Sequence, residues 1–479
     1  MYIKRHLETT IEKLSGCCKV LLVTGPRQVG KTTLLRRLAE GNRTYVTMDD
    51  INVRSLAMTE PGLFLQRYKP PLLIDEIQMA PKLLPYIKMY VDEHGNNGDF
   101  WLTGSHAFDL MENVTESLAG RIAIVHLLGF SHAEVAGLGA GAFVPEEKFL
   151  LQRAQEAEIL PMRDLFEQIW RGSMPALNNA SEQDWNNYYS SYVQTFLQRD
   201  VRALTQVNDE LQFYRFLCAA ASYTGSMVNY AALAKEAEIT APTAKQWLKV
   251  LAAAGLGYLL EPFMHPNLKY GVKAPKVYFT DTGLAAYLLR WSNAEILEAG
   301  AMSSSFLETW AVMEIYKSFS NCGQIPPLGY YRDFNSREVE LVLNVDGSIH
   351  PLAIRKSSSP VKETKKFDIL RLVAEGERAK YYSHATQHQY NTHSVHSHNL
   401  YQIFTYVKNK EAELARADVP HEVSGMLLYA QTDEEIQPDG VYRMSGNQIS
   451  VKTLDLDTPF EDIKVQLDEI VELHFGLFV

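Results

Sequence analysis

Residues Gly25-Pro-Arg-Gln-Val-Gly30-Lys31-Thr32 follow the short apolar run 19–24 and precede the helical spacing of residues 33–40, TLLRRLAE. The pattern G-x-x-x-x-G-K-T between a strand and a helix is typical of a phosphate-binding loop. Its glycines let backbone N–H groups curve around phosphate oxygens, and the helix N-terminus adds partial positive charge. This stretch therefore predicts an α/β domain with a parallel sheet and a nucleotide site at one edge.

Two side chains of this loop carry the expected chemistry. Lys31 would bridge the β- and γ-phosphates of a nucleotide, and the Thr32 hydroxyl would ligate Mg²⁺. A chance occurrence of the pattern is disfavoured, because the flanking strand and helix are also in place.

Two carboxylates follow the next apolar strand. Residues 72–76 read Leu-Leu-Ile-Asp75-Glu76, and such a fully apolar run suits a central parallel strand buried on both faces. Asp75 would hold Mg²⁺ through water, and Glu76 would polarise the attacking water, which predicts a hydrolase site. A purely capping role for this pair is the weaker alternative.

A third strand and a later arginine supply further candidates. The stretch 99–105, DFWLTGS, ends in small polar residues, so Thr103 and Ser105 are both candidates to lie beside the terminal phosphate, and the sequence does not choose between them. A plain polar exit from the strand, with no nucleotide contact, is the alternative. Arg121 is a candidate to neutralise charge on the transferred phosphoryl group, in its own or a neighbouring subunit, or else a plain surface arginine. The residues predicted to bind the nucleotide are Gly25, Pro26, Arg27, Gln28, Val29, Gly30, Lys31, Thr32, Thr33, Asp75, Thr103 and Ser105, and those predicted to act in hydrolysis are Lys31, Glu76 and Arg121.

The charge of the chain is distributed unevenly. Its 479 residues include 46 Lys+Arg and 57 Asp+Glu, a net charge of −11. Residues 411–479 hold 15 acidic and 4 basic side chains, which leaves 42 of each in residues 1–410. The acidic total therefore does not exclude contact between the first 410 residues and nucleic acid.

The cysteines and apolar runs bear on the compartment. Four cysteines form no C-x-x-C pair, which excludes a disulfide framework and a zinc site of that spacing. No apolar signal segment follows the N-terminus, and no run approaches the roughly 20 apolar residues of a membrane span. We therefore expect a cytoplasmic location and no membrane contact.

At this point the chain resembles a known group of ATPases. The phosphate loop, YVTMDD (45–50), LLIDE, FWLTGS and SLAGR (117–121) resemble, in order, bacterial AAA-superfamily ATPases that are similar to archaeal ATPases and carry a C-terminal domain of unknown function. The resemblance covers about residues 1–375 and implies binding of ATP with Mg²⁺ and its hydrolysis. It implies no physiological substrate.

A helix-turn-helix pattern follows a helical connector. Residues 230–237 and 241–251 have amphipathic helical spacing around the turn 238–240, with Thr240 as N-cap and Pro242 in the first helical turn. The second helix presents side chains that can contact phosphates or base edges, namely Thr243, Lys245, Gln246 and Lys249. The pattern predicts a winged helix over 212–290, and it leaves DNA contact and structural packing equally open.

The C-terminal third resembles a nuclease fold without its full set of catalytic residues. In the resembled family this region is similar to the PD-(D/E)XK fold, an α+β domain that needs a helix Glu, a strand acid and E-x-K. Glu308 and Glu340 stand at the first two positions, but the third reads Ala353-Ile-Arg355. A methyl group cannot ligate Mg²⁺, so we expect nuclease activity to be lost.

The end of the chain resembles a second family. From about residue 378 it is similar to the C-terminal end of McrC, the nuclease subunit of a methylcytosine-dependent restriction system. Gln402 and Tyr406 match its accessory helix, whereas its D-x-K reads Arg378-Ala-Lys380 here. The resemblance implies a fusion near residues 375–380, in which both parental nuclease sites lack a metal-binding acid.

Residues 361–410 have two further features. Five histidines lie at 384–398, but no regular spacing organises them, and the McrC resemblance accounts for His384, so a metal cluster is disfavoured. The segment also holds 8 basic and 4 acidic residues, which either contact phosphates or form a solvated helix face.

The sequence thus predicts an ATPase domain, a helical connector, a winged helix, a nuclease-like domain and an acidic tail, with boundaries at 1–135, 136–211, 212–290, 300–410 and 411–479. Three functions compete: an ATPase that couples nucleotide state to DNA-contacting domains, a nucleotide-controlled endonuclease, and a nucleotide-switched adaptor without DNA contact. An oligomer is compatible with each.

Overall fold

The protein is described from a computed structural model. It describes residues 2–104, 118–156, 160–178, 181–201, 210–264, 272–333, 337–345, 348–356, 367, 370, 386–389, 392–395, 407, 424–430, 439–444, 447–455, 458 and 460–475. The chain divides into two compact units, Met1–Ala374 and Glu375–Val479. Each unit is described by itself.

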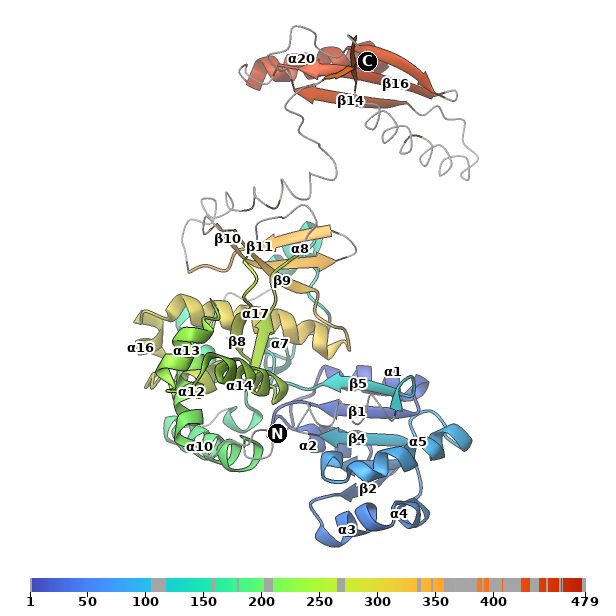
Figure 1. Ribbon diagram of the computed structural model, residues 1–479, viewed down its shortest axis with the longest axis vertical. Helices are drawn as coiled ribbons and strands as arrows, with labels where there is room; N and C mark the ends of the chain where they lie inside the picture. The colour runs from blue at the N-terminus through green and yellow to red at the C-terminus, as the bar shows by residue number, and fades with distance from the viewer. Residues whose placement is uncertain are drawn as a thin grey trace. The chain divides into compact units, whose positions relative to one another are not determined.

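A five-stranded sheet forms the N-terminal part of the first unit (Figure 1). Its strands, all parallel in the order β2-β3-β4-β1-β5, are β1 (Val20–Thr24), β2 (Thr44–Thr47), β3 (Leu72–Asp75), β4 (Phe100–Gly104) and β5 (Ile122–His126). Every residue of β1, β3 and β4 is buried, as expected for central strands covered on both faces. The predicted α/β domain with a parallel sheet is therefore confirmed.

Helices cover both faces of this sheet. Leu21 and Val23 of β1 share a core with α1 (Leu7–Cys17) and α2 (Lys31–Leu38). Alternate residues Val20 and Leu22 instead join the core formed with α3 (Ile51–Thr59), α4 (Pro61–Arg67), η1 (Ile77–Met79), η2 (Pro81–Leu83) and α5 (Leu84–Glu93). Asp50 caps α3, since its carboxylate accepts hydrogen bonds from the N–H groups of Asn52 and Val53.

Helical segments follow the sheet. They are α7 (His132–Val135), α8 (Glu147–Glu156), α9 (Met162–Arg171), η3 (Pro175–Leu177), α10 (Glu182–Thr195) and the π-helical turn η4 (Phe196–Val201). Trp170 of α9 stacks on Trp185 of α10, with ring centroids 4.3 Å apart, so a large aromatic contact joins these helices.

A second, antiparallel sheet comes next. The elements run α12 (Glu210–Ser222), β6 (Ser226–Met227), α13 (Tyr230–Glu236), α14 (Ala241–Ala253), β7 (Gly257–Leu260) and β8 (Lys276–Phe279), with sheet order β6-β8-β7. The Thr240 hydroxyl accepts a hydrogen bond from the Thr243 N–H at 3.3 Å, so Thr240 caps α14 as predicted. Trp247 of α14 packs against Phe213 and Phe216 of α12.

The first unit ends with a long helix and a third sheet. After α15 (Thr282–Leu288) and α16 (Ala294–Ala299), α17 (Ser303–Asn321) leads to β9 (Leu328–Arg332), β10 (Glu338–Val345) and β11 (Ser348–Leu352), antiparallel in the order β11-β10-β9. Val345 pairs with Ser348, so the predicted hairpin is present, although its turn lies outside the described residues.

The second unit contains two small sheets and a helix. Strands β12 (Thr386–Gln389) and β13 (Thr392–Val395) form a hairpin, and β14 (Gly425–Ala430), β15 (Gly440–Met444) and β16 (Asn447–Leu454) form a sheet that precedes α20 (Phe460–Phe475). Strand β14 runs parallel to β16, and β15 runs antiparallel to it. Among the helices that the structure describes, none is long and apolar enough to cross a membrane.

Candidate nucleotide-binding site

The predicted phosphate loop joins β1 to α2 and requires glycine at its first position. Gly25 has φ 141°, and a Cβ built there would lie 2.0 Å from the Leu127 carbonyl oxygen. Gly30 has φ 93° and caps α2 in the left-handed region, which glycine adopts without strain. The backbone therefore has the conformation that the G-x-x-x-x-G pattern predicts.

Lys31 and Thr32 stand at the beginning of α2. The Lys31 ammonium donates to the carbonyl oxygens of Gly25 at 2.9 Å and of Pro26 at 2.7 Å, and only 6% of the residue is exposed. The Lys31 side chain thus folds back over the phosphate loop. A nucleotide phosphate would offer its ammonium a stronger, charged hydrogen-bond partner than these two carbonyls.

Asp75, at the end of β3, collects hydroxyl groups from three elements. Its Oδ1 accepts hydrogen bonds from Thr32 Oγ1 at 2.8 Å and from Thr103 Oγ1 at 2.5 Å, and its Oδ2 accepts one from the Tyr45 hydroxyl at 3.1 Å. Parallel strands β1, β3 and β4 end at the same edge, which brings these residues together. The adjacent Thr32 hydroxyl and Asp75 carboxylate are hard oxygen donors that fit Mg²⁺.

Glu76 lies in an uncommon backbone conformation beside this cluster. Its φ is 56° and its ψ 49°, in the left-handed region that costs a non-glycine residue roughly 1–3 kcal/mol. Its N–H donates to Thr103 Oγ1 at 3.0 Å, and Gln78 donates to its carboxylate. Thr103 is therefore the hydroxyl that joins the two acids, and Ser105 lies outside the described residues.

His126 ends β5 next to the residue that leads into the loop. Its Nδ1 lies 2.6 Å from Thr24 Oγ1, and Thr24 immediately precedes Gly25. Desolvation by the surrounding chain lowers the pKa of His126 below its ordinary value, so the imidazole is neutral at pH 7. Nothing in the sequence pattern singled out this histidine.

Arg121 lies at the other edge of the sheet. It directly precedes β5, which runs parallel to β1 with Val20 opposite Ile122, so the strand length of ~16 Å separates it from the loop edge. Its guanidinium binds both carboxylate oxygens of Asp92. Within one chain Arg121 therefore lies away from the phosphate loop, which disfavours the first of its three alternatives, a role in its own subunit, and is compatible with a plain surface arginine. A role in a neighbouring subunit stays a prediction.

The two acids that the nuclease resemblance singled out, Glu308 and Glu340, each lie beside a cation of the protein. Lys276 Nζ lies 2.9 Å from Glu308 Oε1 and 2.6 Å from Glu338 Oε1, and the Tyr278 hydroxyl donates to Glu308 at 2.7 Å. Arg355, which the resemblance aligned with the lysine of E-x-K, donates to Glu340. Ala353 follows β11 and contributes no ligand, and Lys380, Gln402 and Tyr406 lie outside the described residues.

Apart from the oxygen donors of Thr32 and Asp75, no cluster of metal-binding side chains is found among the residues that the structure describes. There, no three His, Cys, Asp or Glu side chains gather in an arrangement that could hold a metal ion. His384, His396 and His398 are outside the described residues, and His388 pairs with His393 in the β12–β13 hairpin.

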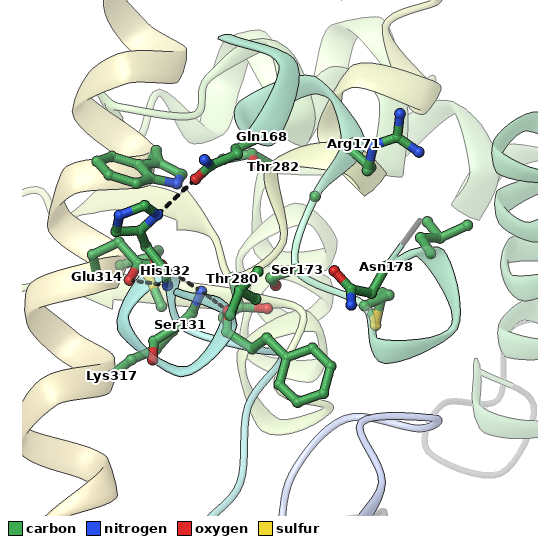
Figure 2. Close-up of a pocket in the computed structure, with 17 residues that line it drawn as sticks. Ser131, His132, Gln168, Arg171, Ser173, Asn178, Thr280, Thr282, Glu314 and Lys317 are labelled. Carbon is green, nitrogen blue, oxygen red and sulfur yellow. Dashed lines mark hydrogen bonds and ion pairs between the residues drawn. The ribbon is translucent and has the colours of Figure 1, made fainter. Parts of the chain in front are cut away.

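A separate pocket lies among α7, α9, the β8–α15 junction and α17 (Figure 2). On one side His132 and Gln168 face each other, with Nδ1 2.8 Å from Oε1, whereas the Arg171 guanidinium points away from them. Near them, Lys317 donates to the Phe130 carbonyl oxygen and to Glu314, both at 2.9 Å. The loop residues 25–32 do not line this pocket, and the sequence analysis did not predict it.

Comparison with known proteins supports a domain-level assignment. Residues 18–136 match the family model described as AAA domain, and residues 162–295 match a domain of unknown function, DUF8612. Uncharacterized proteins of Mycobacterium tuberculosis (Rv2008c) and Mycobacterium bovis (Mb2031c) are each 28% identical over 344 residues, which is 71% of this chain and 71% of theirs. Neither family model reaches the McrC-like end, whose resemblance stays a prediction.

The chain is also similar to solved structures, at low sequence identity. The Walker-type ATPase of Pyrococcus abyssi has a TM-score of 0.39 at 15% identity, with 60% of this chain and 96% of that chain covered. AMPPCP-bound DnaA of Aquifex aeolicus has a TM-score of 0.23 at 12% identity, with 51% and 85% covered. From the phosphate loop and the family match, the N-terminal part of this chain is a P-loop ATPase domain of the AAA type, followed by a domain of unknown function.

Proposed function

We propose that this chain binds ATP with Mg²⁺ at the loop 25–32 and hydrolyses it. The observation that carries the proposal is the convergence of Lys31, Thr32, Asp75 and Thr103 at one sheet edge, with Glu76 beside them. A lysine, two hydroxyls and two carboxylates around a glycine-rich turn are the parts that phosphoryl transfer to water needs.

Each residue has a distinct role in this proposal. Lys31 exchanges the carbonyls of Gly25 and Pro26 for phosphate oxygens. Thr32 and Asp75 would hold Mg²⁺, which supplies charge neutralisation to the phosphates when bound. Glu76 orients the attacking water and accepts its proton. Thr103 holds Glu76 and Asp75 in fixed positions relative to each other, because it accepts a hydrogen bond from the Glu76 N–H and donates one to the Asp75 carboxylate.

The segment 212–290 packs directly against the phosphate loop, so a change in the loop on nucleotide binding can reach it. Gly255, after the C-terminal end of α14, packs on the phosphate loop: a Cβ built there would lie 3.0 Å from the Cδ and Cγ atoms of Pro26. The Thr280 hydroxyl donates to the Gly255 carbonyl at 2.6 Å, which ties this turn to the end of β8. We propose that rearrangement of the loop on binding ATP displaces α14.

The order of elements from α12 to β8 supports the winged-helix interpretation, with α14 as the helix that would enter a DNA groove. Lys245, Gln246 and Lys249 lie exposed on one face of α14, whereas Ala244, Trp247 and Leu248 face the core. We propose DNA contact through this exposed face. An adaptor without DNA contact is the alternative, and it predicts no salt-dependent DNA binding.

A nuclease role is not part of the proposal. Lys276 neutralises Glu308, and Arg355 neutralises Glu340, so a metal ion would have to displace two cations of the protein itself. Plasmid nicking in Mg²⁺ or Mn²⁺ that disappears in Glu340→Ala would overturn this view.

The deciding experiment measures ATP hydrolysis by the full-length chain with and without duplex DNA. Lys31→Ala should lower the rate about 100-fold or more, because it removes charge stabilisation at the phosphates. Lys82→Ala, an exposed lysine in η2, is the matched control and should hydrolyse ATP at the rate of the wild type. Hydrolysis that is unchanged in Lys31→Ala refutes the proposal.

A further inference from the structure

Arg5 is a buried arginine in the segment that precedes α1, and it is 4% exposed. Its guanidinium reaches three parts of the chain. Nε donates to Glu134 Oε1 at 3.0 Å, NH1 to the Val29 carbonyl at 3.0 Å, and NH2 to the carbonyls of Leu128 at 2.7 Å and Gly129 at 3.3 Å. Because the guanidinium is planar and its donors are fixed in a fork, these contacts fix the loop relative to the segment after β5.

Glu134 holds this guanidinium in place. The carboxylate is fully buried and also accepts hydrogen bonds from the N–H groups of His6 and Ser131, both at 2.8 Å. Burial alone would raise the pKa of Glu134, but Arg5 and the two N–H groups lower it below its ordinary value. Glu134 is therefore charged at neutral pH, and the pair is a buried, hydrogen-bonded ion pair that tolerates little displacement.

The bond to Val29 has a consequence for phosphate binding. The Val29 carbonyl and the Gly30 N–H belong to one planar trans peptide, so they point in opposite directions. With the carbonyl held toward Arg5, the Gly30 N–H is turned away from Arg5, at the point where the loop enters α2 and N–H groups face an anion. Arg5 thus sets the direction of a phosphate-binding donor without touching the phosphate.

Arg5 also braces the beginning of the loop. Leu127 donates its N–H to the Thr24 carbonyl at 2.8 Å, and its own carbonyl lies against Gly25. The next two carbonyls, of Leu128 and Gly129, are those that Arg5 binds. One side chain therefore supports the loop from both ends.

We propose that Arg5 is a positioning residue for nucleotide phosphates, acting through the Val29–Gly30 peptide. The inference rests on the proposed ATP binding and goes beyond it. Residue 5 precedes the range 18–136 that the AAA family model matches, and nothing in the phosphate-loop pattern indicates it.

The test compares Arg5→Lys with wild type in the full-length chain. Lysine keeps the positive charge but lacks the planar set of N–H donors with which the Arg5 guanidinium binds Glu134, Val29 and Leu128 at once. Loss of one aligned N–H donor should weaken ATP binding about tenfold and raise KM by a similar factor, with kcat changed far less, because the donor acts in the ground state and the transition state alike. Arg332→Lys, which alters an arginine–carboxylate pair away from the loop, is the control and should leave ATP affinity unchanged.

Two further measurements separate this role from a merely structural one. Hydrogen exchange of the Gly30 amide should be faster in Arg5→Lys than in Arg332→Lys. If Arg5→Lys does not fold, Glu134→Gln serves instead, and it should show the same changes to a smaller degree. Wild-type ATP affinity and wild-type exchange in the folded variant overturn the inference and leave the proposed function standing. A wild-type chain that binds no ATP overturns both.

Discussion

Two regions of this molecule gather acidic side chains, and they differ in what surrounds the acids. At the edge of the parallel sheet, Asp75 is met by the neutral hydroxyls of Thr32, Thr103 and Tyr45. Around helix α17 and strand β10, Glu308 and Glu340 are met by the cations of Lys276 and Arg355. A hydroxyl can share a carboxylate with an incoming cation, whereas an ammonium or guanidinium competes with it. The first cluster is suited to bind Mg²⁺, and the second is a structural ion-pair network.

Removal of Lys276 tests the second half of this comparison and should have the largest effect. Lys276→Met leaves the buried Glu308 and the half-buried Glu338 without their common cation, so the free energy of unfolding of the first unit should fall by about 3–5 kcal/mol. Urea denaturation followed by tryptophan fluorescence measures it. Lys356→Met, which removes a more exposed pair with Glu298, should cost about 1 kcal/mol or less. Equal losses would contradict a structural network at Lys276.

Asp75→Asn tests whether the acid at the edge of the parallel sheet binds Mg²⁺. The amide keeps acceptor capacity for the hydroxyls of Thr32 and Thr103 but removes the charge that Mg²⁺ needs, so ATP hydrolysis should fall about 100-fold. Nucleotide binding without Mg²⁺ should persist. The matched variant in the other cluster is Glu340→Gln, which should hydrolyse ATP normally. Full activity of Asp75→Asn would show that this acid has no part in the reaction.

The pH dependence of stability should also distinguish the network. Burial would raise the pKa of Glu338, but Lys276 and Arg332 lower it below its ordinary value. Its stabilising contribution is therefore present above the unfolded-state pKa of about 4.3 and is lost as pH falls through the lower folded-state pKa. The difference in unfolding free energy between wild type and Glu338→Gln should be constant between pH 7 and about pH 5 and should shrink below about pH 4. A difference that grows on acidification would contradict this ion pair.

Tyr45→Phe should have the smallest effect. It removes one neutral hydrogen bond to Asp75, with a net value of about 1 kcal/mol, so ATP hydrolysis should change about threefold to fivefold. Tyr86→Phe, at an exposed position on α5, is the control. A loss as large as that of Asp75→Asn would mean that Tyr45 contacts the substrate itself.

Local sequence patterns predicted the parts of the site that depend on neighbouring residues. Strand, loop and helix around residues 19–40 are recognisable because their glycines, lysine and apolar spacing are contiguous, and Asp75 follows from its place after an apolar strand. The Thr240 cap and the β10–β11 hairpin have equally short signals.

Residues whose role depends on distant partners could not be predicted in this way. Arg5 and Lys276 look like ordinary basic residues until folding brings Val29 and Glu308 to them. The sequence left open whether Arg121 acts in its own subunit, in a neighbouring one or only at the surface. Strand direction narrows that choice, because a residue directly before a parallel strand lies at the amino edge of the sheet, away from the loop.

The contact between Gly25 and Leu127 has a consequence for how such motifs are compared among relatives. The atom that excludes a side chain at position 25 is a backbone carbonyl oxygen, and no substitution at Leu127 can remove it. No substitution at Leu127 can therefore make room for a side chain at position 25. Glycine is retained at this position as long as the fold is retained. A descendant that had stopped binding nucleotides would still carry this glycine, so loss of the ancestral activity would be visible at Lys31 or Asp75 long before it was visible at Gly25.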